Sequence, residues 1–188
     1  MRKQWDTTKK LYTLCILTED TPGILSQVAR LFSRKGYNIE SIVSGATDRP
    51  GTARISIELL ADELIINQLA TQCRRLLGVQ AVKIFDEESC IRREIALIKV
   101  KAADHSARDE VIQLSNIFRG HIIDVDRESL TVWVFGSQSK NAALISMLEE
   151  FGILEIAKTG TIAIERGRST IYDASKLKEE YEYGKNVL

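Results

Sequence analysis

The 188-residue sequence has few of the residues that build disulfides, metal sites or membrane anchors. Its three cysteines, Cys15, Cys73 and Cys90, are an odd number without CxxC spacing, and only two histidines accompany them. This pattern argues for reduced thiols in a cytosol and against a zinc site, so we expect no metal ligands. No apolar run approaches the ~20 residues that span a bilayer, and the polar start is unlike a signal peptide. We therefore expect a cytoplasmic protein that does not bind membranes.

Net charge gives no reason to expect a nucleic acid as partner. Lys+Arg and Asp+Glu are equal at 26 each, so the formal net charge is zero. A balanced chain does not in general attract phosphate backbones. The hydrophobic content of 44% is enough for a packed core, in a chain long enough for one ordinary domain or two small ones.

The period of the apolar positions predicts a first module at residues 10–86. Its expected order is strand, helix, strand, strand, helix, strand, at 11–17, 24–36, 39–46, 53–60, 65–77 and 79–85. Asp20 or Thr21 is a candidate N-cap of the first helix, and Pro22 suits its first turn. The segment Asp48-Arg49-Pro50-Gly51 predicts a hairpin between the second and third strands.

The same order of elements repeats in the second half, which predicts a second module at residues 91–166. Strands are expected at 94–101, 121–126, 130–135 and 153–164, and helices at 107–118 and 141–151. The fold class is then α+β, with two tandem ferredoxin-like βαββαβ modules and a boundary in the charged stretch 86–89. Residues 167–188 form a polar tail, in which 175–183 is either an exposed helix or a mobile segment.

Two turns in the first module carry candidate binding groups. Where the first strand gives way to a helix, the amides of Gly23, Ile24 and Leu25 can hold a carboxylate at the positive end of the helix dipole. Asn38 follows the helix-ending Gly36 and offers both an amide donor and an acceptor. Each feature also has a purely structural explanation. Proline and glycine are common where a helix begins, and asparagine adopts the left-handed backbone conformation found where a helix ends.

The two turns together resemble the signature of ACT domains. The segment RKGYNIES at 34–41 is similar to that of the acetolactate synthase regulatory subunits. Two further segments, REIALIKV at 93–100 and IFRGHIIDV at 117–125, resemble the carboxy-terminal half of the same family, which generic amino-acid-binding ACT proteins lack. The resemblance extends over roughly residues 11–166, and it implies that the first module is an ACT domain.

The resemblance implies a homodimer that binds valine or another branched-chain amino acid between its paired ACT modules. One chain then contributes its first loop and the other its asparagine-containing turn. The implied effector-binding residues are Asp20, Gly23, Ile24, Leu25, Asn38, Ile39 and Gln68. Asp20 departs from the family, which commonly has asparagine there. Its carboxylate can attract the ammonium of the ligand or repel its carboxylate.

The resemblance also implies that this chain is not an enzyme. The sequence contains no thiamine-diphosphate motif, flavin motif or phosphate loop, and we identify no catalytic residues. In the family a separate large subunit binds thiamine diphosphate, magnesium and FAD and forms the precursors of valine, leucine and isoleucine. The small subunit activates that catalytic partner and confers feedback inhibition.

Two other functions remain open from the sequence. One is an amino-acid-sensing ACT regulator of another partner, although no helix-turn-helix pattern indicates gene regulation. The other is an RNA-binding module, because such proteins use the same order of strands and helices. The third strand of the first module, at 53–60, lacks the aromatic side chains on which bases stack.

Overall fold

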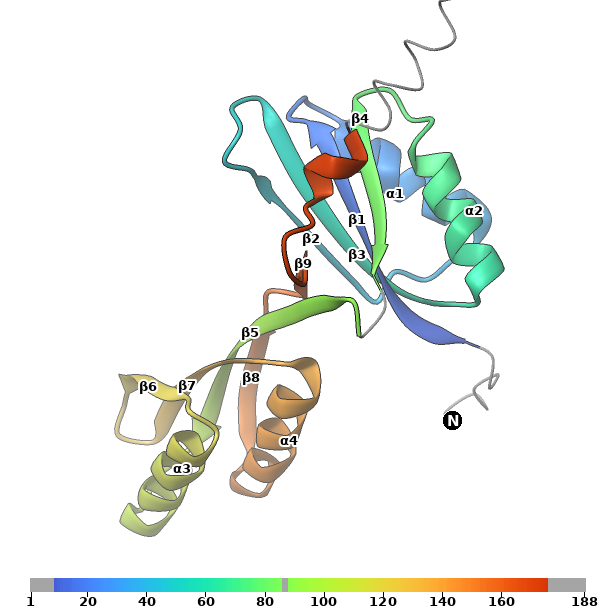
Figure 1. Cartoon of the computed structure of the whole chain (residues 1–188). Helices are drawn as coiled ribbons and strands as arrows, with labels where there is room; N and C mark the ends of the chain where they lie inside the picture. The colour runs from blue at the N-terminus through green and yellow to red at the C-terminus, as the bar shows by residue number, and fades with distance from the viewer. Residues whose placement is uncertain (1–8, 86–87, 176–188) are drawn as a thin grey trace, which may run out of the picture. The chain divides into compact units, whose positions relative to one another are not determined.

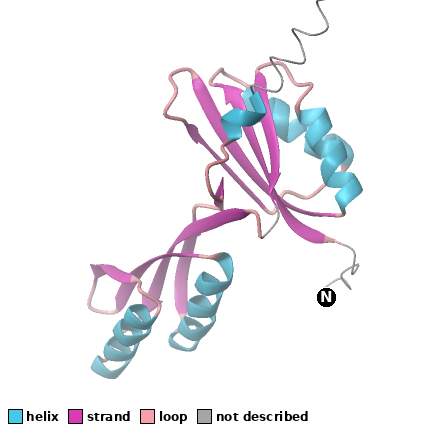
Figure 2. Cartoon of the chain, in the orientation of Figure 1, coloured by secondary structure: helices cyan, strands magenta, loops and turns pink. Residues whose placement is uncertain are grey.

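A computed structural model describes residues 9–85 and 88–175 of the chain. Two compact units are present (Figures 1 and 2). The first combines Met1–Ile91 with Ile162–Leu188, and the second is Arg92–Thr161. The second unit is therefore formed by a segment that lies between two parts of the first unit in the sequence.

The first unit is a four-stranded antiparallel sheet with two helices on one face (Figure 1). Its elements are β1 (Lys10–Glu19), α1 (Ile24–Lys35), β2 (Ser41–Ala46), β3 (Thr52–Ala61), α2 (Glu63–Cys73) and β4 (Val79–Phe85). The strands lie in the order β2-β3-β1-β4. This is the expected βαββαβ order, so the prediction of a ferredoxin-like first module is confirmed.

The central strand β1 is buried on both faces because its apolar residues do not alternate with polar ones. Leu14 and Ile16 pack with Val28 and Phe32 of α1 in the helix-side core. Cys15 and Leu17 point to the opposite face, where they are at most 1% exposed. An apolar strand of this kind needs a layer on each side of its sheet.

The second unit repeats the architecture. Its elements are β5 (Cys90–Lys101), whose first two residues belong to the first unit, α3 (His105–Ile117), β6 (His121–Val125), β7 (Ser129–Gly136), α4 (Gln138–Leu148), a 3-10 turn (Glu149–Phe151) and β8 (Ile153–Lys158). The order β6-β7-β5-β8 again matches a ferredoxin-like sheet. One face carries the core, including Ile98 and Val132. Leu97 and Phe135 on the other face are 38% and 43% exposed.

The start of α1 differs from the expectation. Gly23, and neither Asp20 nor Thr21, is the N-cap, and no side chain accepts a hydrogen bond from the first turn. Pro22 consequently lies before the helix. The reason is the left-handed conformation of Gly23, with φ 88°, which turns the chain into the helix without a side-chain cap.

The expected strand at 153–164 is wrong, because the chain breaks it in two. Gly160 adopts φ 80°, and β8 ends at Lys158. A separate strand, β9 (Ile162–Glu165), pairs with β5, and the chain continues to a helical turn at 171–175. Residues 162–175 therefore belong to the first unit, which differs from the expected module boundaries of 91–166 and 167–188.

Residues 162–175, which we call the covering segment, lie over the face of the first sheet that the helices leave bare (Figure 1). Ala163 and Ile171 are 5% and 4% exposed and pack with Leu17, Ala81 and Phe85. The segment supplies the second layer that β1 requires. Residues 10–86 by themselves leave this apolar face without that layer.

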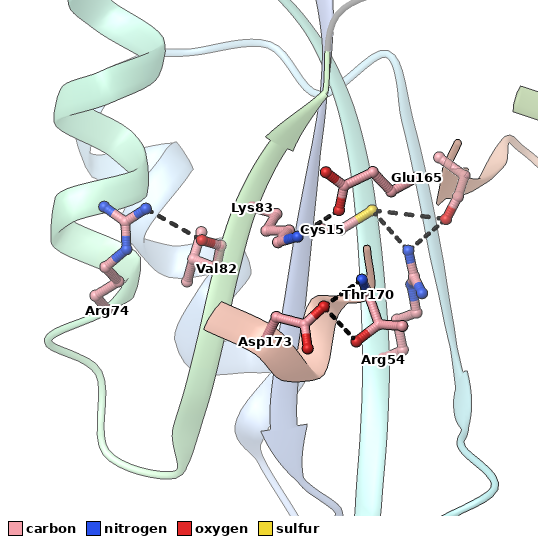
Figure 3. Close-up of polar contacts among 9 residues, drawn as sticks. Cys15, Arg54, Arg74, Val82, Lys83, Glu165, Thr170 and Asp173 are labelled. Atoms are coloured by element: carbon pink, nitrogen blue, oxygen red, sulfur yellow. Dashed lines mark hydrogen bonds and ion pairs between the residues drawn. The ribbon is translucent and has the colours of Figure 1, made fainter. Parts of the chain in front are cut away.

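Polar contacts anchor the covering segment to the strands beneath it (Figure 3). Lys83 of β4 forms an ion pair with Glu165, and the guanidinium of Arg54 donates a hydrogen bond to the carbonyl of Ala163. The same guanidinium lies 3.4 Å from Cys15 Sγ. Inside the segment, the backbone N–H of Thr170 donates to the carboxylate of Asp173 at 2.7 Å, which starts the final helical turn.

We expect Ile171→Ala to lower the free energy of unfolding of the first unit by about 2 to 4 kcal/mol, because it leaves a cavity in the buried layer. Ile164→Ala is the matched control on the same segment, since Ile164 is 58% exposed. It should change stability by no more than about 0.5 kcal/mol. Urea unfolding followed by circular dichroism measures both. Equal effects of the two substitutions would contradict a covering role for the segment.

Candidate functional site

The loop between β1 and α1 presents backbone N–H groups to solvent, as a carboxylate-binding turn requires. Among the described residues, the amides of Gly23, Leu25 and Ser26 have no hydrogen-bond acceptor. The amide of Ile24 donates to the carbonyl of Thr21 at 3.3 Å. Ile24 therefore contributes less than expected, and Ser26 is a residue that the sequence analysis missed. Its signal was the first-turn position, since the first four N–H groups of any helix lack intrahelical partners.

Gly23 leaves this turn accessible. A Cβ at Gly23 would meet no atom within 4 Å beyond its chain neighbours, so the space on that side of Gly23 is open within its own chain. Ile24 is 7% exposed and points into the core, whereas Leu25 is 42% exposed. A ligand carboxylate can thus approach the free amides at the positive end of α1.

Asn38 lies in an exposed turn between α1 and β2. Its side-chain amide donates a hydrogen bond to Glu40 Oε1 at 2.8 Å, so one of the two groups expected to bind a ligand is engaged. The side-chain carbonyl is left as an acceptor that suits an ammonium group. Ile39 beside it is half-buried and packs against the core of the first unit, which holds the turn in place.

A single chain does not bring the two turns together. Gly23 and Asn38 flank opposite ends of α1, whose 12 residues span about 18 Å. Gln68 is exposed on α2, between the buried Ile66 and Leu69, and it belongs to neither turn. A site that uses both turns therefore needs a second chain.

The loop at 20–25 is held by the hairpin turn that joins β2 and β3. The backbone N–H of Asp20 donates to the carbonyl of Gly51 at 2.8 Å. In the turn itself, the N–H of Thr47 donates to the carbonyl of Thr52 at 3.0 Å, and that of Arg49 donates to Thr47 Oγ1 at 3.1 Å. The position of the candidate loop thus depends on residues about 30 positions away, as β1 and β3 are paired neighbours.

Two cavities in the first unit lie away from both candidate turns. An open groove of about 390 Å³ runs beside α1 and α2 and is lined by Arg30, Arg34 and Gln72 among others. A cavity of about 370 Å³ lies between the hairpin turn and the covering segment, where Arg54 and Tyr172 line it. Neither contains Gly23 or Asn38 in its wall.

The described residues contain no cluster of three or more His, Cys, Asp or Glu side chains able to hold a metal ion. All three cysteines are buried and carry reduced thiols. Burial raises the pKa of the Cys73 thiol to about 12, which leaves it protonated at neutral pH and unsuited to nucleophilic attack. In the described part of the chain, no helix is long and apolar enough to cross a membrane.

Comparison with protein families finds two matches that together span most of the chain. Residues 14–81 match the acetohydroxyacid synthase (AHAS) small subunit-like ACT domain. Residues 93–167 match the family described as small subunit of acetolactate synthase.

Similar proteins come from bacteria and archaea. The acetolactate synthase small subunit of Mycobacterium bovis is 44% identical over 158 residues, which is 84% of this chain and 94% of that protein. A probable acetolactate synthase small subunit of Methanothermobacter thermautotrophicus is 40% identical over 160 residues, 85% of this chain and 95% of that protein. The crystal structure of the small subunit from Thermotoga maritima has a TM-score of 0.78 at 37% identity, covering 85% of this chain and 99% of that one.

Proposed function

Because this chain belongs to the acetolactate synthase small-subunit family, we propose that it is the regulatory subunit of that enzyme in branched-chain amino-acid biosynthesis. It activates a cytoplasmic catalytic subunit and confers feedback inhibition by valine or a related amino acid. The catalytic chemistry belongs to the large subunit, which carries thiamine diphosphate, magnesium and FAD. The chain itself binds none of these.

The observation that carries the proposal is the uncapped start of α1. The amides of Gly23, Leu25 and Ser26 donate to no acceptor among the described residues, and the start of α1 has no side-chain cap. A carboxylate satisfies such donors and gains from the helix dipole. The carbonyl of Asn38 in turn suits an ammonium group, so the two turns together match the two charged ends of a free amino acid.

The edge of the sheet in the first unit indicates how two chains can pair to complete this site. Among the described strands, β2 lies at the edge of the sheet and pairs with β3, and Ile42 on it is 39% exposed. Antiparallel pairing of β2 with β2 of a second chain places the start of one strand beside the end of the other. Its six residues span about 20 Å, close to the length of α1. Asn38 of one chain then approaches loop 20–25 of the other.

Regulation follows by linkage. If the effector binds one arrangement of the dimer more tightly and the catalytic subunit prefers another, each ligand weakens binding of the other by the same factor. An effector bound at about 0.1 to 1 mM has roughly 4 to 5.5 kcal/mol of binding free energy. A difference of about 1 to 3 kcal/mol between arrangements is then enough to switch activity.

The second unit offers a surface for the catalytic subunit. Leu97, Trp133 and Phe135 lie on the sheet face opposite α3 and α4. Along β5 and β7 they alternate with residues that point into the core of the second unit. Leu97 and Phe135 are exposed, and His121 stacks on Trp133 with the ring centroids 5.4 Å apart. Lys99 and Glu155, which are cross-strand partners on β5 and β8, add charged groups to the same face. An exposed apolar patch beside charged groups is typical of a protein interface.

The assembly itself is tested by mixing the purified chain with the catalytic subunit from the same organism. We expect the chain alone to be a dimer without acetolactate synthase activity, and the mixture to show a raised rate that valine lowers. Analytical ultracentrifugation and an acetolactate assay measure these outcomes. A monomer at micromolar concentration would contradict the shared effector site, and turnover by the pure chain would contradict the non-catalytic role.

Substitution of Gly23 tests the effector site. Gly23→Asp places a carboxylate beside the free amides, and we expect valine affinity to fall at least about tenfold through charge repulsion. Gly23→Asn is the matched control, because it has nearly the same shape and tolerates a left-handed backbone equally well. Calorimetry should show a much smaller loss for the Asn variant. Equal affinities in folded, dimeric Asp and Asn variants would rule out carboxylate binding at this turn.

Substitution of Phe135 tests the surface of the second unit. We expect Phe135→Glu to weaken activation of the catalytic subunit about tenfold or more, because it buries a charge in an apolar interface. Valine binding to the isolated chain should be unchanged. Ile117→Glu is the control, since Ile117 is 73% exposed at the end of α3. Activation titrations that give the same midpoint for both variants would exclude this face.

A further inference from the structure

Tyr172 of the covering segment holds the hairpin turn of the ACT module through two contacts. Its hydroxyl donates a hydrogen bond to Asp48 Oδ1 at 2.6 Å. Its ring packs under the guanidinium of Arg49, with Arg49 Cζ 3.6 Å from the ring centroid. The hydrogen bond from Tyr172 lowers the pKa of the Asp48 carboxyl, so Asp48 accepts it as a carboxylate at neutral pH. All three residues belong to the first unit.

Hydrogen bonds connect the hairpin turn that Tyr172 contacts to the loop at 20–25. Backbone and hydroxyl hydrogen bonds among Thr47, Arg49 and Thr52 connect the two sides of the turn. At its far end the carbonyl of Gly51 accepts the N–H of Asp20 at 2.8 Å. A continuous series of contacts therefore leads from Tyr172 through the turn to the first residue of the loop.

Within the loop, the N–H of Ile24 donates to the carbonyl of Thr21 at 3.3 Å. Gly23 caps α1 without a side-chain hydrogen bond, and a Cβ at Gly23 would touch nothing within 4 Å. The side chain of Ile24, which is buried, anchors the end of the loop in the core. The bond from Asp20 to Gly51 is the contact through which the hairpin turn restrains the loop that leads into α1.

We propose that Tyr172 is a positioning residue for the effector loop, acting through Asp48, Arg49 and the carbonyl of Gly51. This inference deepens the proposed function and rests on the effector site at residues 20–26. It also makes the covering segment a part of the sensor: docking of Tyr172 favours the loop geometry that binds the effector, and a bound effector favours docking of Tyr172 by the same factor.

Hydrogen–deuterium exchange of the full-length chain tests the inference without any ligand. In Tyr172→Ala we expect faster exchange of the Asp20 amide, followed in a peptide that spans residues 20–25, because its hydrogen bond to the Gly51 carbonyl is loosened. Tyr172→Phe keeps the ring beneath Arg49 and loses the hydroxyl, so it should show a smaller increase. The valine dissociation constant from calorimetry should rise about three- to tenfold in the Ala variant and less in the Phe variant.

Glu165→Gln is the control, because it removes another anchor of the covering segment, the ion pair to Lys83, that does not lead to the hairpin turn. It should leave exchange at 20–25 and valine affinity at wild-type values. Unchanged exchange in a folded Tyr172→Ala protein, or an equal increase in Glu165→Gln, would overturn the inference. If the wild-type chain binds no valine, the proposed effector fails, whereas the exchange comparison still decides the role of Tyr172.

Discussion

The sheet of the first unit is apolar on both of its faces, and the rest of the chain is arranged to cover them. Leu14 and Ile16 of β1 require the two helices, while Cys15 and Leu17 require a second layer on the opposite side. The covering segment supplies that layer from the far end of the sequence. Because it does so, the second unit is an insertion within the first rather than an appended module.

The sequence was sufficient to predict both ferredoxin-like units, because their apolar periods change clearly from strand to helix. It did not reveal that residues 162–175 return to the first unit. The apolar run at 153–164 reads as one strand, and the break at Gly160 depends on which sheet each half pairs with. The chain does contain one local sign of the second layer: the strand at 11–17 is apolar at nearly every position.

The sequence predicted where the candidate site lies, but it predicted only some of the groups that are free to bind a ligand. The pattern of Pro22 and Gly23 indicated a turn with free amides, but not that Ile24 is engaged and Ser26 is free. The contact of Asn38 with Glu40 was also hidden, because side-chain hydrogen bonds depend on turn geometry. The bond from Asp20 to Gly51 joins segments that are distant in sequence, and periodicity carries no signal of such a contact.

The insertion has a consequence for biosynthesis. A ribosome releases residues 92–161, the whole of the second unit, before it releases Ile171. The second unit can thus complete its fold while the first still exposes Leu17 and Phe85, the residues that Ile171 later covers. During this interval the nascent chain carries an uncovered apolar sheet. The first unit, although it is made first, is the last to be finished.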